Sequence, residues 1–257
     1  MAAFCARNAA AVDYDGAFPA DEFALIARSG LLAAPLRREL GGLGLGVDGY
    51  PGSTLTLLRV LKTLGRGNLA VGRVYEGHVN ALQLVRTFGT ADQIARAAAD
   101  VRDGHKLFGV WNTEAAGGVR IVPTGDGGYQ LEGAKTFTSG AGHVARALVP
   151  GALVRPATGG GDEQRVGWQM CLVPMDEVET EIDPSFWRPL GMRASASYRV
   201  AFDGVELPAG ALIAEPGDYY RQPLFTGGAI RFAAVQLGGA EALFDAARDY
   251  LRWSLDA

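Results

Sequence analysis

Few side chains in this sequence have the type and spacing needed to bind a metal ion. The 257 residues include two cysteines, Cys5 and Cys171, and three scattered histidines, His78, His105 and His143. Two cysteines so far apart fit neither a disulfide framework nor a zinc site. We therefore predict no metal-binding residues.

A glycine run from Gly41 to Gly46 (GGLGLG) invites comparison with dinucleotide-binding loops. Such a loop follows a β-strand and opens a helix whose N-terminus meets a pyrophosphate. Here the run follows the helix-like stretch Leu-Arg-Arg-Glu-Leu, and Pro51 comes soon after it. A flexible turn is the better interpretation.

Two other stretches carry more chemical information: Phe108–Gly118 (FGVWNTEAAGG) and Lys135–Ser139 (KTFTS). Taken alone, they read as a strand end with a glycine turn and as a barrel strand with a core phenylalanine. Together with Tyr129–Gly142 and Gly191–Gly217, however, they resemble the flavin-binding middle domain of acyl-CoA dehydrogenases. Gly30–Gly46 looks like part of that family's N-terminal domain. The resemblance extends from about Phe23 to Tyr250.

The resemblance implies FAD as the cofactor and assigns it a set of binding residues. An aromatic face and a hydroxyl donor suit a planar redox ring, and small residues let the backbone approach a bulky cofactor. Ala115 stands where relatives have proline, and Val119 where they usually have serine. The implied cofactor-binding residues are Val110, Thr113, Gly117, Gly118, Phe137 and Ser139.

The resemblance implies Val119, Arg193 and Arg231 as substrate-binding residues, although a structural salt bridge is the more ordinary role for an arginine such as Arg193. Arg231 lies two residues beyond the family's usual arginine position, about 200° around a helix. Abstraction of an α-proton needs a carboxylate aimed at the substrate's Cα. Glu114, Glu241 and His78 do not meet that need, so we predict no catalytic residue within the chain.

The first hundred residues predict helices that would support these stretches. Asp21 is expected to cap a helix ending at Gly30, and Ser53 to begin one that ends at Gly65. A third helix is expected from Leu69 to Phe88. Thr90 and Gln93 have the spacing of a capping box, which predicts a helix to about Arg102.

Short β-rich runs broken by glycine and proline turns follow, from Lys106 to Leu207, and predict an antiparallel barrel or sandwich. Asp126-Gly127-Gly128 and Asp203-Gly204 are both expected to be hairpin turns, because Asp-Gly supplies positive φ. Residues 147–154 and 168–173 are further expected strands, with a polar loop at 157–163 between them.

A last helix is expected from about Gly227, with apolar residues around much of its circumference. The predicted fold class is α+β and acyl-CoA dehydrogenase-like. Residues 1–105 would form an N-terminal helical domain, 106–222 a flavin-facing β-domain, and 223–257 the first helix of a truncated helical bundle. Another subunit would cover that helix, or the chain would be an incomplete version of a longer one.

The net charge of −4 gives no electrostatic footprint for nucleic acid. No window approaches ~18 uninterrupted apolar residues and no signal peptide is evident, so we expect a cytoplasmic protein without a membrane span. We expect first an FAD-dependent dehydrogenase acting on acyl-CoA or a related small molecule, in a homo- or hetero-oligomer. The alternatives are a flavin monooxygenase of the same fold and a non-catalytic partner subunit.

Overall fold

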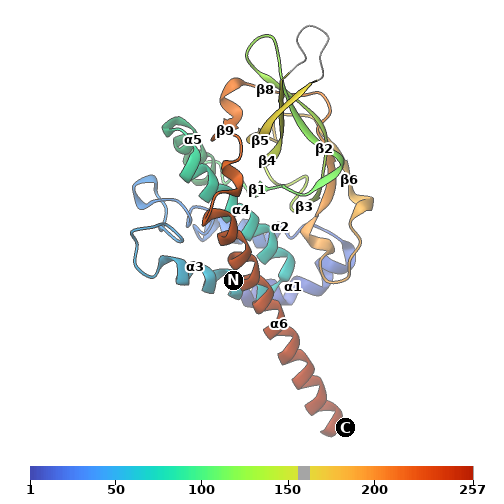
Figure 1. The fold of residues 1–257 in the computed structure, drawn as a ribbon. Helices are drawn as coiled ribbons and strands as arrows, with labels where there is room; N and C mark the ends of the chain where they lie inside the picture. The colour runs from blue at the N-terminus through green and yellow to red at the C-terminus, as the bar shows by residue number, and fades with distance from the viewer. Residues whose placement is uncertain (156–162, 257) are drawn as a thin grey trace.

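A computed structural model describes residues 1–155 and 163–256, which form a helical layer packed against a curved β-sheet (Figure 1). Five helices come first and a sixth follows the sheet. They are α1 (Ala2–Asp15), α2 (Ala20–Arg28), α3 (Ser53–Gly67), α4 (Leu69–Phe88), α5 (Ala91–Arg102) and α6 (Leu224–Asp256).

The helices α2 to α6 follow the sequence pattern closely, with small differences at their ends, whereas α1 was not predicted as a separate helix. The capping box at α5 is formed, with Thr90 Oγ1 accepting from Gln93 N and Gln93 Oε1 accepting from Thr90 N. Asp21 is not the cap of α2, because the helix begins one residue earlier and Pro19 occupies the cap position. The last helix begins at Leu224, three residues before the expected Gly227.

Among the described residues the sheet has nine strands, and most of its pairings are antiparallel. Its main path runs β6-β7-β3-β2-β4-β5-β9, while β1 pairs in parallel with β4 and β8 pairs with β3. The strands are β1 (Phe108–Val110), β2 (Glu114–Pro123), β3 (Tyr129–Thr138), β4 (Arg146–Arg155), β5 (Gln164–Pro174), β6 (Glu181–Asp183), β7 (Tyr198–Ala201), β8 (Val205–Leu207) and β9 (Leu212–Ile213).

One expected hairpin is present and the other is not. β2 and β3 pair around Asp126–Gly128 as predicted. The expectation for Asp203-Gly204 was wrong, since β7 and β8 both pair antiparallel with β3 and therefore run in the same direction. Asp203 Oδ1 accepts a hydrogen bond from Gly133 N, which fixes the bend between β7 and β8 against β3. The loop expected at 157–163 lies almost wholly outside the described residues.

A fully buried histidine joins the helical layer to the sheet. His78 of α4 accepts from Phe108 N through Nδ1 at 3.1 Å, and Nε2 donates to Leu32 O at 2.8 Å. These two partners require the neutral tautomer with the proton on Nε2. Burial lowers the pKa of His78 to about 4, because the charged ring would lose its hydration.

The first half of α6 packs closely on α3 and α4. Val235 is wholly buried there, and a Cβ placed on Gly238 would lie 2.0 Å from Lys62 O. Lys62 Nζ and Glu241 Oε1, 2.7 Å apart, form an ion pair along this contact. None of the helices in the described part of the chain is both long and apolar enough to cross a membrane.

Candidate active site

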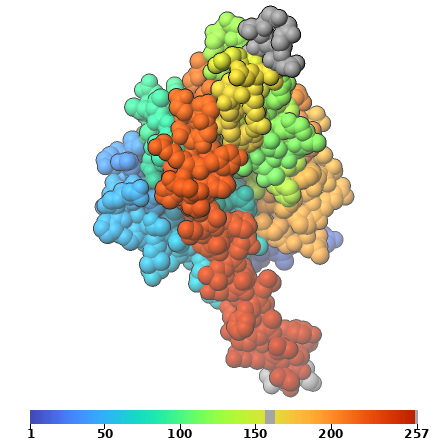
Figure 2. All heavy atoms as spheres, in the orientation of Figure 1, coloured from blue at the N-terminus to red at the C-terminus, as the bar shows by residue number. Residues whose placement is uncertain are grey.

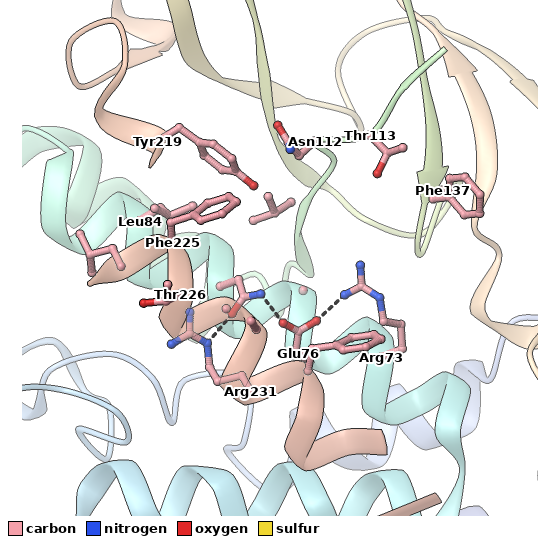
Figure 3. A pocket seen from close by; sticks show the side chains of 17 residues that line it. Arg73, Glu76, Leu84, Asn112, Thr113, Phe137, Tyr219, Phe225, Thr226 and Arg231 are labelled. Carbon is pink, nitrogen blue, oxygen red and sulfur yellow. Dashed lines mark hydrogen bonds and ion pairs between the residues drawn. The ribbon is translucent and has the colours of Figure 1, made fainter. Parts of the chain in front are cut away.

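A cavity of about 400 Å³ lies where the two layers meet the start of α6 (Figure 3). The helix α4 supplies one polar wall, and the first two turns of α6 supply a second wall. The segment after β1 and the aromatic residue Phe137 at the end of β3 close the opposite side. The volume is within the range of small-molecule sites, at its lower end.

The backbone presents Phe137 to this cavity by an unusual turn of β3. Phe137 has φ of 54°, and the pairing of β3 with β7 shifts register between Lys135 and Thr138. Positive φ is rare for an aromatic residue and is found where surrounding structure enforces it, often at functional sites. The ring is 47% exposed and is held edge-on by Phe186 and Trp187, with ring centroids 5.2 and 5.6 Å away.

The segment Trp111–Glu114 runs along the cavity and is fixed by β3. Thr136 N donates to Thr113 O at 2.9 Å, and Trp111 Nε1 donates to Ser139 O at 3.1 Å. The side chains of Asn112 and Thr113 line the cavity. Asn112 Oδ1 is buried and has no hydrogen-bond partner among the described residues, so an acceptor remains available there.

Lys135 supports the same segment from within the sheet. Its side chain is fully buried, and Nζ donates to Asn112 O and Glu114 Oε1, both at 3.1 Å. Nζ also lies 4.8 Å from the ring centroid of Trp168. Burial lowers the pKa of Lys135, while Glu114 opposes that shift. Lys135 therefore orders the loop and does not itself line the cavity.

The polar wall is a chain of charged and amide groups, of which the sequence predicted Arg231 but not Arg73, Glu76 or Asn80. Arg73 donates to Glu76 Oε2, Asn80 Nδ2 donates to Glu76 Oε1, and Arg231 Nε donates to Asn80 Oδ1. Glu76 is only 2% exposed. Positions 73, 76 and 80 share one face of a helix. The polar stripe that these positions form on a largely apolar helix is the sequence feature that could have predicted this wall.

The predicted site residues divide into two groups. Val110, Thr113, Phe137 and Arg231 line the cavity. Gly117 and Gly118 lie within β2 and not in a separate turn, and their positive φ of 89° and 67° falls where the pairing of β2 with β3 is irregular, between Glu114 and Val119. Their contact with a cofactor stays a prediction.

The other three predicted residues do not line the cavity. Ser139 Oγ shares a hydrogen bond with Ser197 Oγ at 2.8 Å, and Val119 is wholly buried in β2. Arg193 is bound to α1, since its N and Nη1 donate to Asp13 at 2.8 and 2.9 Å. The ordinary structural role considered for Arg193 is the one that this geometry supports.

The cavity's residues suit a flavin ring. Phe137 offers a flat apolar face, Thr113 a hydroxyl, and the orphaned Asn112 Oδ1 an acceptor for a ring N–H. Gly118 has φ of 67°, a backbone conformation that favours glycine, and a Cβ there would also crowd a carboxylate oxygen of Glu114 at 2.5 Å. Gly117 has open space around it, which permits close approach of a ligand to its backbone.

Comparison with known proteins supports the same fold. Residues 1–105 match the family model "Acyl-CoA dehydrogenase, N-terminal domain". The probable acyl-CoA dehydrogenase YngJ of Bacillus subtilis is 27% identical, over 96% of this chain and 64% of its own length. The amino sugar nitrososynthase RubN8 of Streptomyces rubradiris is 31% identical, over 94% and 56% respectively.

Among solved structures, the dibenzothiophene monooxygenase TdsC of Paenibacillus sp. A11-2, crystallised with FMN and indole, superposes with a TM-score of 0.80. It is 25% identical and is matched over 97% of this chain and 63% of its own. The chain thus spans somewhat over half the length of these relatives, which include dehydrogenases and flavin monooxygenases. Residues 1–105 thus belong to the acyl-CoA dehydrogenase N-terminal domain family, and the chain as a whole has the acyl-CoA dehydrogenase-like fold.

Proposed function

We propose that this chain holds the flavin- and substrate-binding portion of a flavin-dependent oxidoreductase. The observation that carries the proposal is the cavity, in which Phe137, Thr113 and Asn112 lie across from a polar wall built by α4 and α6. When bound, the flavin would supply the hydride-accepting or oxygen-activating chemistry. The residues of this chain would bind and orient the ring and exclude water from one face.

Between the family's two activities, the cavity favours oxygenation. An α-proton base needs a carboxylate oxygen that is free to meet the substrate's Cα. Glu76 is the carboxylate on the described lining, and both of its oxygens accept hydrogen bonds, from Arg73 and Asn80. Likeness to TdsC and RubN8 supports the same choice and suggests a small organic substrate.

The acyl-CoA dehydrogenase favoured by the sequence is the second candidate. Glu76 lies on the same cavity as Phe137, so a rearranged wall would release a carboxylate toward the ring. FAD is the cofactor that the sequence resemblance implies, while TdsC was crystallised with FMN. By the resemblance, the small residues at 115–118 would approach the pyrophosphate that FAD has and FMN lacks.

The test begins with flavin uptake. We would incubate the purified chain with FAD or FMN, remove free flavin, and record the visible spectrum and the quenching of flavin fluorescence. Phe137→Ala should weaken flavin binding about tenfold, because one stacked aromatic contact is lost. Tyr14→Ala is the control, since Tyr14 is 84% exposed on α1 and lies off the cavity. A wild-type chain that retains neither flavin overturns the proposal and leaves the partner-subunit hypothesis.

The second step separates the two activities. Bleaching of the bound flavin by mixed acyl-CoAs without oxygen would identify the dehydrogenase. The proposal instead expects no bleaching, and incorporation of label from ¹⁸O₂ into an organic probe such as indole once the flavin has been reduced.

A further inference from the structure

The cavity lining carries unequal charge. Its charged side chains within the described residues are Arg73, Arg231 and Glu76, so the wall is positive by one unit. Glu76 pairs directly with Arg73, whereas Arg231 reaches Glu76 only through the neutral amide of Asn80. The excess positive charge therefore belongs to Arg231.

The end of the Arg231 side chain is open toward the cavity. Its Nε atom is occupied by Asn80, but no hydrogen bond or ion pair joins Nη1 or Nη2 to any residue that the structure describes. Gly227 and Gly228 lie against these nitrogens, and Cβ atoms there would come within 3.1 Å of Nη1 and 3.9 Å of Nη2. The N–H groups of Nη1 and Nη2 are thus left to bind a ligand, and the glycines beside them add no side chains that would block it.

The surroundings make this guanidinium a strong anion site. Burial lowers the pKa of Arg231, which means that its charge is poorly hydrated, and the attraction of Glu76 opposes the shift only in part. Charge-assisted hydrogen bonds gain strength when both partners are removed from water. The first turn of α6, with Phe225 and Thr226 on the lining, adds the positive end of its helix dipole.

We propose that the substrate carries an acidic oxyanion group, a carboxylate, sulfonate or phosphate, which binds Nη1 and Nη2 of Arg231. This proposal rests on the proposed function and names its substrate class. Asn80 positions the guanidinium of Arg231. The charges of Arg73 and Glu76 offset each other in their ion pair, so neither is left over for the substrate. The organic part of the substrate then lies toward Val110 and Phe137, where the flavin ring would be.

The experiment compares matched acids and amides. Benzoate and benzamide, and indole-3-acetate and indole-3-acetamide, would be titrated calorimetrically into the protein with and without flavin. Benzenesulfonate and phenyl phosphate test tetrahedral oxyanions. The acids should bind at least tenfold more tightly than their amides, and the difference should shrink as salt increases. Arg231→Gln should abolish that preference, and Arg231→Lys should keep part of it.

Arg252→Gln is the matched control, because Arg252 is exposed on the same helix and lies away from the cavity. Circular dichroism would show that each variant keeps its helices. Equal binding of acids and amides, equal acid binding by wild type and Arg231→Gln, or no acid binding at all overturns the proposal. Flavin uptake is read separately, so a protein that binds flavin without preferring acids refutes this inference alone.

Discussion

At the scale of single residues, Glu76 is the least expected feature of this chain. A carboxylate that is 2% exposed would be costly without partners, and here Arg73 and Asn80 occupy both of its oxygens. Its negative charge also moderates the positive potential that Arg231 presents to the cavity. Glu76 is therefore expected to influence both stability and ligand binding, in opposite directions.

We predict that Glu76→Gln lowers the free energy of unfolding by about 1–3 kcal/mol, because it leaves Arg73 without its buried counter-charge. The same change should tighten binding of benzoate severalfold, since the wall gains net positive charge. Urea unfolding and calorimetry measure the two effects. Glu132→Gln is the control: its ion pair with Arg120 is half exposed and should be worth less than about 1 kcal/mol. Equal losses in both variants would contradict the argument.

His78 predicts a dependence of stability on pH. Its folded pKa of about 4 lies below the ordinary 6.5, so the unfolded chain binds the proton first as pH falls. Stability from this group is complete above about pH 6.5 and is lost between pH 6.5 and 4, by roughly 3 kcal/mol. Thermal unfolding across this range should show a shallower slope for His78→Gln. His105→Asn, at an exposed turn with positive φ, should follow wild type.

At the scale of elements, the crossing of α6 over α3 depends on glycine. Gly65 and Gly238 bring the two backbones into contact, since a Cβ on Gly65 would lie 2.3 Å from Val235 O and one on Gly238 would lie 2.0 Å from Lys62 O. This close approach places the first turns of α6, and with them Arg231, against α4. The cavity's second wall follows from that packing.

Gly238→Ala should therefore destabilise the protein by about 2–3 kcal/mol, because a methyl group at this crossing must push backbone atoms apart. Gly77→Ala is the contrasting variant. Its new Cβ would meet only Arg73 Nη1, at 3.8 Å, and alanine is the better helix former, so a gain of about 0.5–1 kcal/mol is expected. Chemical denaturation measures both. Similar effects of the same sign would show that the crossing does not need glycine.

These elements also show how much of the fold and of the site could be predicted from the sequence. Periodic apolar residues and the Thr90 capping box predicted α3, α4 and α5, because such signals are local. The Asp203-Gly204 turn misled, since a dipeptide fixes a bend but not the strand with which the following residues pair. Asn80 links Arg231 to Glu76. It is four residues from Glu76 in the sequence but 151 residues from Arg231. Only the packing of α6 on α4 brings them together.

At the scale of the whole molecule, α6 divides into a packed half and a projecting half. Its second half extends away from the body, as Figures 1 and 2 show. That half exposes a set of large apolar side chains: Leu243, Phe244, Tyr250, Leu251, Trp253 and Leu255. Contiguous apolar surface of this kind is unusual on a monomeric protein and marks an interaction surface or a tendency to aggregate.

We predict that the isolated chain binds a hydrophobic dye and self-associates as its concentration rises. Leu243 and Leu251 are eight residues apart on one face of α6, and they are 74% and 60% exposed. Replacing both by arginine should shift association to at least tenfold higher concentration without unwinding the helix, because arginine is a good helix former. Tyr14→Arg, an isolated exposed position on α1, should change neither property. Light scattering over a concentration series, with dye fluorescence on the same samples, measures both properties. A wild-type chain that stays monomeric and binds no dye would show that this face is not an interaction surface.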